Sequence, residues 1–363
     1  MKRALVFISA FLTAHFLSYA QLTFVVDSSS INAFFSIAQT LSEDKQPTSD
    51  QWQALRKTKG YQFIFDDLKL KESIKIAFSP SESQTRDSLL SLDTLNFQAH
   101  TIRHLLEAQQ HGLEIKTYLQ RTDFEALLRQ AHANVRQFIP KRLSIDSSVP
   151  PLYLAIFQPD AYAQNNVIIA DLSAAKKVGK KAFVDILTHE LYHYYRAVHL
   201  PFLDDGDIQA FGGRHYPILK MMVDVQNEGS ADLIDKTYPP SPKDPYFKLL
   251  PEPLMQSYQR SFYDTPTVLE KIDSLLVLAA NDTGYVSNEI YKLLDFGGHP
   301  QGFYMSSLIK EKVGLQAIVN SFDNPVAFIR LYNQAARDEG IEFVFSLKAM
   351  DYLEELEKQY FTQ

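Results

Sequence analysis

The sequence of 363 residues contains no cysteine. This absence excludes a disulfide framework and a lipid-modified N-terminal cysteine. It also restricts any metal site to histidine and carboxylate ligands. For a chain that is exported, the lack of cysteine favours a bacterial periplasm or exterior over a eukaryotic secretory route.

An excess of basic residues is also missing, because 36 lysines and arginines face 43 aspartates and glutamates, which gives a net charge of -7. Nucleic acid is therefore not expected as a partner, since neutralising phosphates needs a basic surface. The remaining composition, 45% hydrophobic and 22% charged, is that of an ordinary globular protein with one large domain or two modest ones.

The N-terminus reads MKRALVFISAFLTAHFLSYA, with two basic residues, an apolar run from Ala4 to Leu17, and small residues at a cleavage site. The apolar run of about 14 residues is shorter than the roughly 20 that a membrane-spanning helix needs. We therefore predict a signal peptide at residues 1–20, and a mature chain that begins at Gln21 and has no stable membrane anchor. Removing Lys2 and Arg3 lowers the net charge by two, from -7 to -9.

The hydrophobic pattern predicts an α+β fold that is predominantly helical. Apolar residues recur at helical spacing from about residue 27 to 140 and again from 250 to 360. One early helix is expected to begin with Ser49 or Asp50 as its N-cap and to stop at Gly60. Residues 152–157 and 165–172 are rich in β-branched and aromatic residues and predict two strands, followed by helices at 181–199 and 217–235. The proline-rich segment 238–245 is the predicted linker.

Two short motifs on the two central helices carry the chemistry. In THELYH, residues 188–193, His189 and His193 lie one turn apart and can bind one cation, with Glu190 beside it. In NEGSAD, residues 227–232, Glu228 and Asp232 also lie one turn apart. A catalytic zinc commonly takes three protein ligands, and a ligating histidine donates its other ring N–H to an acceptor. We therefore predict Glu228 as the third ligand and Asp232 as that acceptor, with an exposed acidic helix face as the alternative.

HELYH followed by NEGSAD resembles the gluzincin metallopeptidases, the thermolysin-like group. The resemblance implies that His189, His193 and Glu228 bind Zn²⁺, that Glu190 is the general base, and that Asp232 orients a histidine. The interval from His193 to Glu228 is longer than in thermolysin and departs from that pattern. The layout is similar to that of exported bacterial zinc peptidases of unknown function. It implies a helical N-terminal region at 21–148, a zincin-like core at 149–237, and a helical C-terminal region at 246–363 that completes the active site.

Hydrolysis of an amide needs a hydrogen-bond donor for the oxyanion that forms on the carbonyl oxygen. DFGGHPQGFYM, residues 295–305, contains candidates for this donor, and its two glycines permit a tight turn. This stretch is similar to the glycine-rich stretch that carries a catalytic histidine in thermolysin-like enzymes, although one residue before the histidine is missing. His299 and Tyr304 are the first candidates, and His215 and Tyr216 are the alternatives. Each of them could instead belong to a turn or to the core.

Three further patterns have ordinary explanations. His100 and His104 lie one turn apart, but without a neighbouring carboxylate we expect a solvated helix face rather than a metal pair. DDGD, residues 204–207, fits no complete calcium loop and is expected to be a solvated turn. The strand at 165–172 is either an exposed edge that binds substrate peptide or an internal strand, and the sequence leaves both open.

The leading interpretation is an exported zinc peptidase that acts on a peptide or protein substrate, with Glu190 taking a proton from the attacking water. Two alternatives remain open. Two histidines and a carboxylate also form the facial triad of non-haem iron enzymes, and the zinc could be structural in a non-catalytic binding protein.

Overall fold

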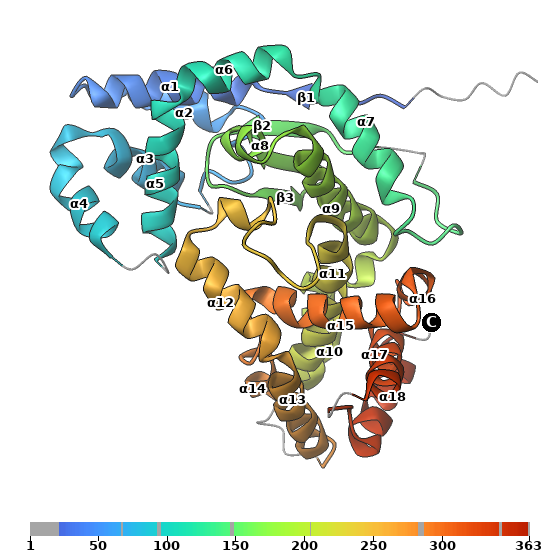
Figure 1. The fold of residues 1–363 in the computed structure, drawn as a ribbon. Coiled ribbons are helices and arrows are strands. Elements are labelled where there is room, and N and C mark those ends of the chain that lie inside the picture. The colour runs from blue at the N-terminus through green and yellow to red at the C-terminus, as the bar shows by residue number, and fades with distance from the viewer. Residues whose placement is uncertain are drawn as a thin grey trace, which may run out of the picture.

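The computed structural model describes residues 22–361 except 67, 93–95, 146–148, 204, 282–286 and 341–342. The predicted signal peptide and Gln21 therefore lie outside the described residues. The fold is α+β and predominantly helical, as predicted, with one small sheet. In Figure 1 the N-terminal helices lie above this sheet and to either side of it, and the C-terminal helices lie below it. In the described ranges, none of the helices is long and apolar enough to cross a membrane.

The N-terminal helices follow one another along the chain: α1 Ser29–Ser42, α2 Ser49–Arg56, α3 Leu70–Phe78, η1 Pro80–Glu82, α4 Ser83–Ser91, α5 Phe97–Gln110, α6 Gly112–Arg121 and α7 Phe124–Val135. The start of α2 is fixed by a capping box in which Thr48 and Gln51 each accept a hydrogen bond from the other's backbone N–H. The N-cap thus precedes the predicted Ser49 or Asp50, and α2 ends at Arg56, before Gly60.

The sheet contains four strands: β1 Val26–Asp27, β2 Leu152–Ala155, β3 Ala161–Gln164 and β4 Val167–Asp171. Their order is β1-β2-β4-β3, with β4 parallel to β2 and antiparallel to β3. β3 and β4 form a hairpin whose turn residues, Asn165 and Asn166, have φ of 50° and 61°, which asparagine tolerates well. The predicted strand at 165–172 is therefore internal, and the edge strand is β3, which the sequence pattern did not predict.

The central helices are α8 Leu172–Val178, α9 Lys180–His199, η2 Pro201–Leu203, α10 Asp205–Gly212, η3 Gly213–His215 and α11 Tyr216–Asp235. α9 and α11 confirm the predicted helices at 181–199 and 217–235 to within one residue. Gly179, with φ of 82°, precedes α9, and Pro201 follows it, so both of its ends are encoded locally. α9 packs against α7 and α11, and its inner face is buried.

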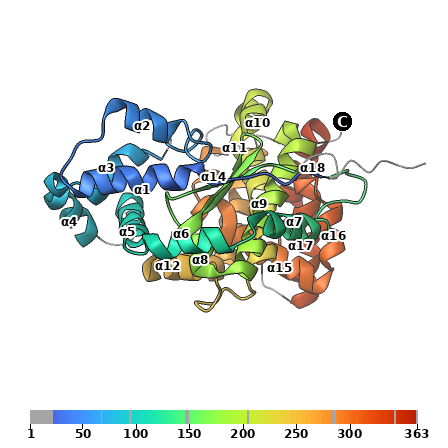
Figure 2. The same ribbon diagram turned by 90° about the horizontal axis from the view of Figure 1, so that it is seen from above.

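The C-terminal region continues with η4 Phe247–Leu249, α12 Glu252–Tyr263, α13 Thr265–Ala279, α14 Ser287–Tyr291, η5 Asp295–Gly298, α15 His299–Lys312, α16 Leu315–Asn320, α17 Pro325–Glu339 and α18 Leu347–Tyr360. α15 crosses α11 where two glycines meet. A Cβ on Gly229 would lie 2.2 Å from the backbone of Gly302, so both positions need glycine. This close approach brings the start of α15 to α11, and Figure 1 shows the two helices crossing. Figure 2 shows the fold from above, with α1 to α5 on one side of the molecule and α15 to α18 on the other.

The predicted linker, 238–245, contains no helix or strand. It is nevertheless held in place, because the buried Asp244 accepts hydrogen bonds from the backbone and the hydroxyl of Thr237. The division of the chain at residues 148, 237 and 246 stays a prediction.

Candidate metal centre

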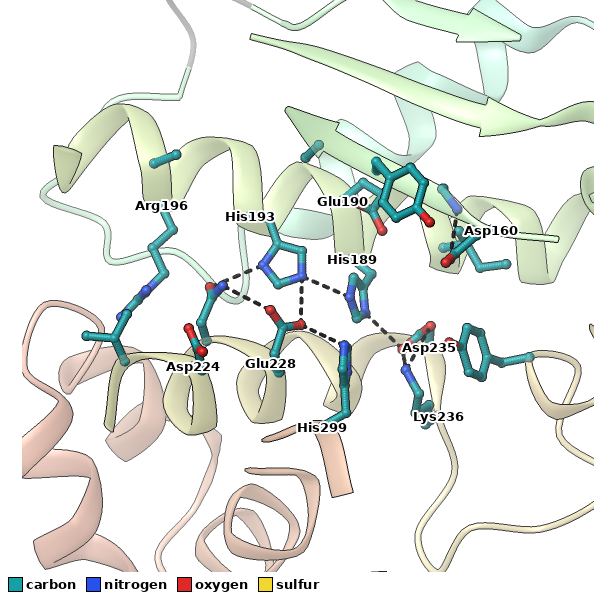
Figure 3. A pocket seen from close by; sticks show the side chains of 18 of the residues that line it. Asp160, His189, Glu190, His193, Arg196, Asp224, Glu228, Asp235, Lys236 and His299 are labelled. Carbon is teal, nitrogen blue, oxygen red and sulfur yellow. Dashed lines mark hydrogen bonds and ion pairs between the residues drawn. The ribbon is translucent and has the colours of Figure 1, made fainter. Parts of the chain in front are cut away.

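α9 presents His189 and His193 on the face that turns toward α11 (Figure 3). The two residues are one turn apart, so their rings lie side by side with centroids 4.7 Å from one another. The Nε2 atoms of the two rings are 2.9 Å apart. The histidine pair predicted from HELYH is thus formed by the local geometry of a single helix.

α11 places Glu228 opposite this pair, with Oε2 at 3.2 Å from Nε2 of His193. One ligand atom from each of His189, His193 and Glu228 lies within 4.8 Å of the others. Two imidazole nitrogens and one carboxylate oxygen form the donor set of a mononuclear zinc site that keeps a further position open. The three predicted ligands therefore converge from two helices that are far apart in sequence.

The hydrogen bonds behind the two rings test whether a cation fits between them. Nδ1 of His189 donates to Asp235 at 3.1 Å, and Nδ1 of His193 donates to Asn227 at 3.1 Å. In neutral imidazoles this leaves both Nε2 atoms as acceptors that face one another at 2.9 Å. Two facing lone pairs repel unless a cation or a proton lies between them, so the residues present fit a zinc ion.

The neighbouring charges act on the protonation of this site. Burial lowers the pKa of His193, but the Glu228 carboxylate outweighs burial and raises this pKa to about 9. Glu228 itself is held well below its ordinary pKa, because His193 and His299 outweigh the effect of its burial. The carboxylate is therefore ionised and ready to bind a cation.

The role of Asp232 differs from the prediction. Asp232 was expected to accept from a histidine ligand, but His189 lies 3.8 Å from it and donates to Asp235 instead. Asp232 accepts from Nδ1 of His299 at 3.0 Å and from the hydroxyl of Tyr258 at 3.0 Å, and it pairs with Lys236. Asp232 and Asp235 follow Glu228 by one and two turns on the same face of α11, but of the two only Asp235 comes within hydrogen-bond distance of His189.

Asn227 and Asp235 were missed as partners of the histidines. The signal was present in the sequence: Asn227 directly precedes Glu228, and Asp235 follows Glu228 by two turns on the same helical face, beyond Asp232. Asp232 is fully buried, and Lys236 and His299 hold its pKa below the ordinary value although burial acts in the opposite direction.

Glu190 lies in the same cleft, on α9 between the two histidines, and it is 8% exposed. Burial, with added repulsion from Asp160 and Glu228, raises its pKa to about 8, although His193 acts in the opposite direction. A carboxylate whose pKa lies near neutrality is well matched to proton transfer. It is not part of either cluster of potential ligands that the described residues form.

His299 is brought to the site by the turn that the glycines predicted. Gly297 and Gly298 have φ of 66° and 93°, and α15 begins directly after them. Nε2 of His299 lies 3.1 Å from Oε2 of Glu228. Burial lowers the pKa of His299, but Asp232 and Glu228 raise it to about 9, so the ring is a cationic donor in the cleft.

The other predicted oxyanion donors lie elsewhere. Tyr304 packs its ring against Phe262 and Tyr332 and does not line the cleft, because five residues along a helix turn it well away from the face of His299. His215 donates to or accepts from the Tyr360 hydroxyl at 2.8 Å, and neither it nor Tyr216 lines the cleft. The structure therefore does not bring Tyr304, His215 or Tyr216 into the cleft, where an oxyanion donor would have to lie.

The expectations for the His100–His104 pair and for the DDGD segment are also corrected by the structure. His104 is buried and pairs with Asp171 at 3.0 Å, and burial lowers the pKa of His100 to about 4, so this face of α5 is not solvated. Residues 205–207 begin helix α10 rather than forming a turn, and Asp204 lies outside the described residues. In the described part of the chain, both clusters of possible ligands include His189.

The site opens into a cavity of about 460 Å³ between α9 and α11. Residues of the edge strand β3, from Ala161 to Ala163, line it together with Asp160. Figure 3 shows Asp160 and Lys236 toward one end of the site and Arg196 beyond His193 at the other. The cleft is large enough for part of a peptide or for a small ligand.

The donor set, the cleft and the buried carboxylate beside the histidines are those of a zinc-dependent enzyme. Residues 52–340 match the model of the family described as "Putative zinc dependent peptidase (DUF5700)". The chain belongs to this family, and zinc is the metal that the family description names. Comparison with curated proteins gives no match, and neither does comparison with solved structures.

Proposed function

We propose that the protein is an exported peptidase of the gluzincin type that hydrolyses amide bonds at the zinc site of α9 and α11. The observation that carries this proposal is the convergence of His189, His193 and Glu228 beside Glu190 in one cleft. The family description supports zinc-dependent hydrolysis in general. Export follows from the predicted signal peptide alone.

When bound, zinc would polarise the scissile carbonyl and make a water molecule easier to deprotonate. His189, His193 and Glu228 would hold it, and Asp235 and Asn227 fix the ring orientations. Glu190 takes the proton of the attacking water and passes it on to the leaving amine. His299, kept cationic by Asp232, donates a hydrogen bond to the oxygen that becomes negative.

The edge strand β3 is placed to hold the substrate chain. In the described sheet its partner is β4 on one side, and its residues line the cleft on the other. A peptide in extended conformation can add to such an edge by main-chain hydrogen bonds. The binding of substrate peptide that the sequence suggested for residues 165–172 is therefore proposed for residues 161–164 instead.

The test is the variant Glu190→Gln, which keeps the size of the side chain but loses its basicity. We expect it to retain zinc, measured by metal analysis, and wild-type thermal stability. Peptide hydrolysis should fall by at least about 10²-fold, the lower end of the range for acid-base catalysis. Hydrolysis at the wild-type rate with zinc bound would exclude Glu190 as the base. Absence of hydrolysis in the wild-type protein across a diverse peptide library would favour a structural zinc.

A further inference from the structure

Arg196 lies on α9, three residues after His193, and its side chain extends toward α11 at one end of the cleft (Figure 3). The residue is only 4% exposed and lines the cavity. One terminal nitrogen donates to Oε1 of Gln226 at 2.7 Å, while Nε has no hydrogen-bond partner among the described residues. A buried guanidinium with an unused donor is costly unless an anion accepts from it.

The carboxylates near Arg196 have other partners. Asp224 accepts from Lys220 at 2.9 Å and from Tyr291 at 3.1 Å. Glu228 faces the histidines, and Asp323 pairs with Arg142. In the part of the chain that the structure describes, no carboxylate oxygen lies within 4.0 Å of a guanidinium nitrogen of Arg196. Among the described residues, the charge of this guanidinium is therefore not matched by an ion pair.

The surroundings of Arg196 suit a short aliphatic stem that ends in a carboxylate. Ala197, Leu200 and Leu203 bring apolar side chains to the cavity from the end of α9 and from η2, and Val223 brings another from α11. Gln226 is buried and donates to the Ser321 carbonyl, so it holds the guanidinium in place. This part of the cleft lies beyond His193, in the same cavity as the three proposed zinc ligands.

We propose that Arg196 forms a subsite that binds a carboxylate of the substrate, either on an acidic side chain or at the C-terminus of the peptide. This inference rests on the proposed function for its setting. It concerns recognition, however, and can be measured by binding without any hydrolysis. Arg196 is then a specificity-determining residue that contacts the substrate directly.

The probes are two hydroxamates that differ in one group, a carboxylate in one and the corresponding carboxamide in the other. Binding to the zinc-loaded wild-type protein and to Arg196→Gln is measured by calorimetry. The carboxylate should bind the wild-type protein about 10- to 100-fold more tightly, the range for a charged hydrogen bond. In Arg196→Gln this preference should vanish while the affinity for the carboxamide changes little. Arg121→Gln removes an exposed charge elsewhere and is the matched control.

Equal binding of the two probes to the wild-type protein would overturn the inference, with no need for a folded variant. A preference that persists in Arg196→Gln would overturn it as well, and so would an equal loss of affinity for both probes, because a purely structural role predicts that pattern. Arg196→Lys retains the charge and should keep part of the preference.

Peptide pairs then separate the two sources of the carboxylate. A Glu-to-Gln change next to the cleaved bond tests the side chain, and amidation of the C-terminus tests the terminal carboxylate. If the wild-type protein prefers the carboxylate probe in binding but cleaves no peptide, the proposed peptidase function is contradicted. The proposed carboxylate subsite at Arg196 is then still supported.

Discussion

Asp235 is the residue that sets the ring orientation of His189. It accepts the Nδ1 hydrogen at 3.1 Å and pairs with Lys236 at 3.3 Å. Burial raises its pKa, but Lys236 and His189 outweigh burial and hold this pKa below its ordinary value, so the carboxylate stays charged. A charged acceptor fixes the tautomer of the histidine and makes its Nε2 a stronger ligand.

We expect Asp235→Asn to weaken zinc binding by about 10- to 100-fold, the range found when such partners are removed. The amide keeps the shape of the side chain but lacks the charge that polarises His189. Zinc affinity is measured by competition with a chelator of known affinity. Asp351→Asn, which changes an exposed aspartate on α18, is the control. Unchanged zinc affinity in Asp235→Asn would show that the hydrogen bond to His189 has no influence on the metal.

At the level of elements, the crossing of α11 and α15 determines whether His299 reaches the zinc site. Gly229 and Gly302 face one another there, and a Cβ on Gly302 would lie 2.2 Å from the carbonyl oxygen of Val225. Backbone cannot move aside as a flexible side chain can. The two helices would have to separate, and His299, the first residue of α15, would move with them.

We therefore expect Gly302→Ala to lower the free energy of unfolding by about 1–3 kcal/mol or more, the usual cost of overpacking. Turnover should also fall, while zinc binding, which depends on α9 and α11, is less affected. Denaturant unfolding and peptide hydrolysis measure the two effects. The control is Gly212→Ala, where the nearest atom to a new Cβ would be a side-chain atom of Leu219 at 3.1 Å. Equal effects of the two substitutions would contradict the role given to the crossing.

The elements that the sequence predicted well are those whose signals are local. α9 and α11 have apolar stripes and, for α9, a glycine and a proline at the ends, so their bounds follow from neighbouring residues. The histidine pair and Glu228 follow from helical spacing. β3 was missed because its four residues gain their pairing only from β4, which is a tertiary contact. Tyr304 was wrongly expected at the site because the sequence does not tell which face of α15 meets α11. Arg196 was not predicted because it belongs to no recognisable sequence motif.

At the scale of the whole molecule, a zinc ion held by His189, His193 and Glu228 would join α9 to α11 and should stabilise the complete fold. Ligand binding to the folded state alone stabilises it by about 4 kcal/mol when free zinc exceeds Kd by about 1,000-fold. We therefore expect removal of zinc by a chelator to lower Tm by several degrees. Differential scanning calorimetry of the zinc-loaded and zinc-free protein measures the shift.

This shift should depend on pH. The pKa of His193 is about 9 in the zinc-free fold, above the ordinary value of about 6.5. A raised pKa stabilises the zinc-free protein below about pH 6.5, and this contribution is lost as the pH rises through about 9. Protons on His193 compete with zinc over the same interval. The difference in Tm between the two forms should therefore grow from about pH 6.5 to 9. A difference that shrinks with rising pH would contradict proton competition at His193.

The short strand β1 has a consequence for the order in which the chain can fold. Val26 pairs with Leu152, and all the helices from α1 to α7 lie between these two residues in the sequence. Contacts between distant segments form late, because a long loop must close before they give any stabilisation. During synthesis, the N-terminal helices would emerge before their sheet exists, and the sheet would complete only when β4 follows. The chain would thus stay incompletely folded while its first half is made, a state compatible with passage across a membrane.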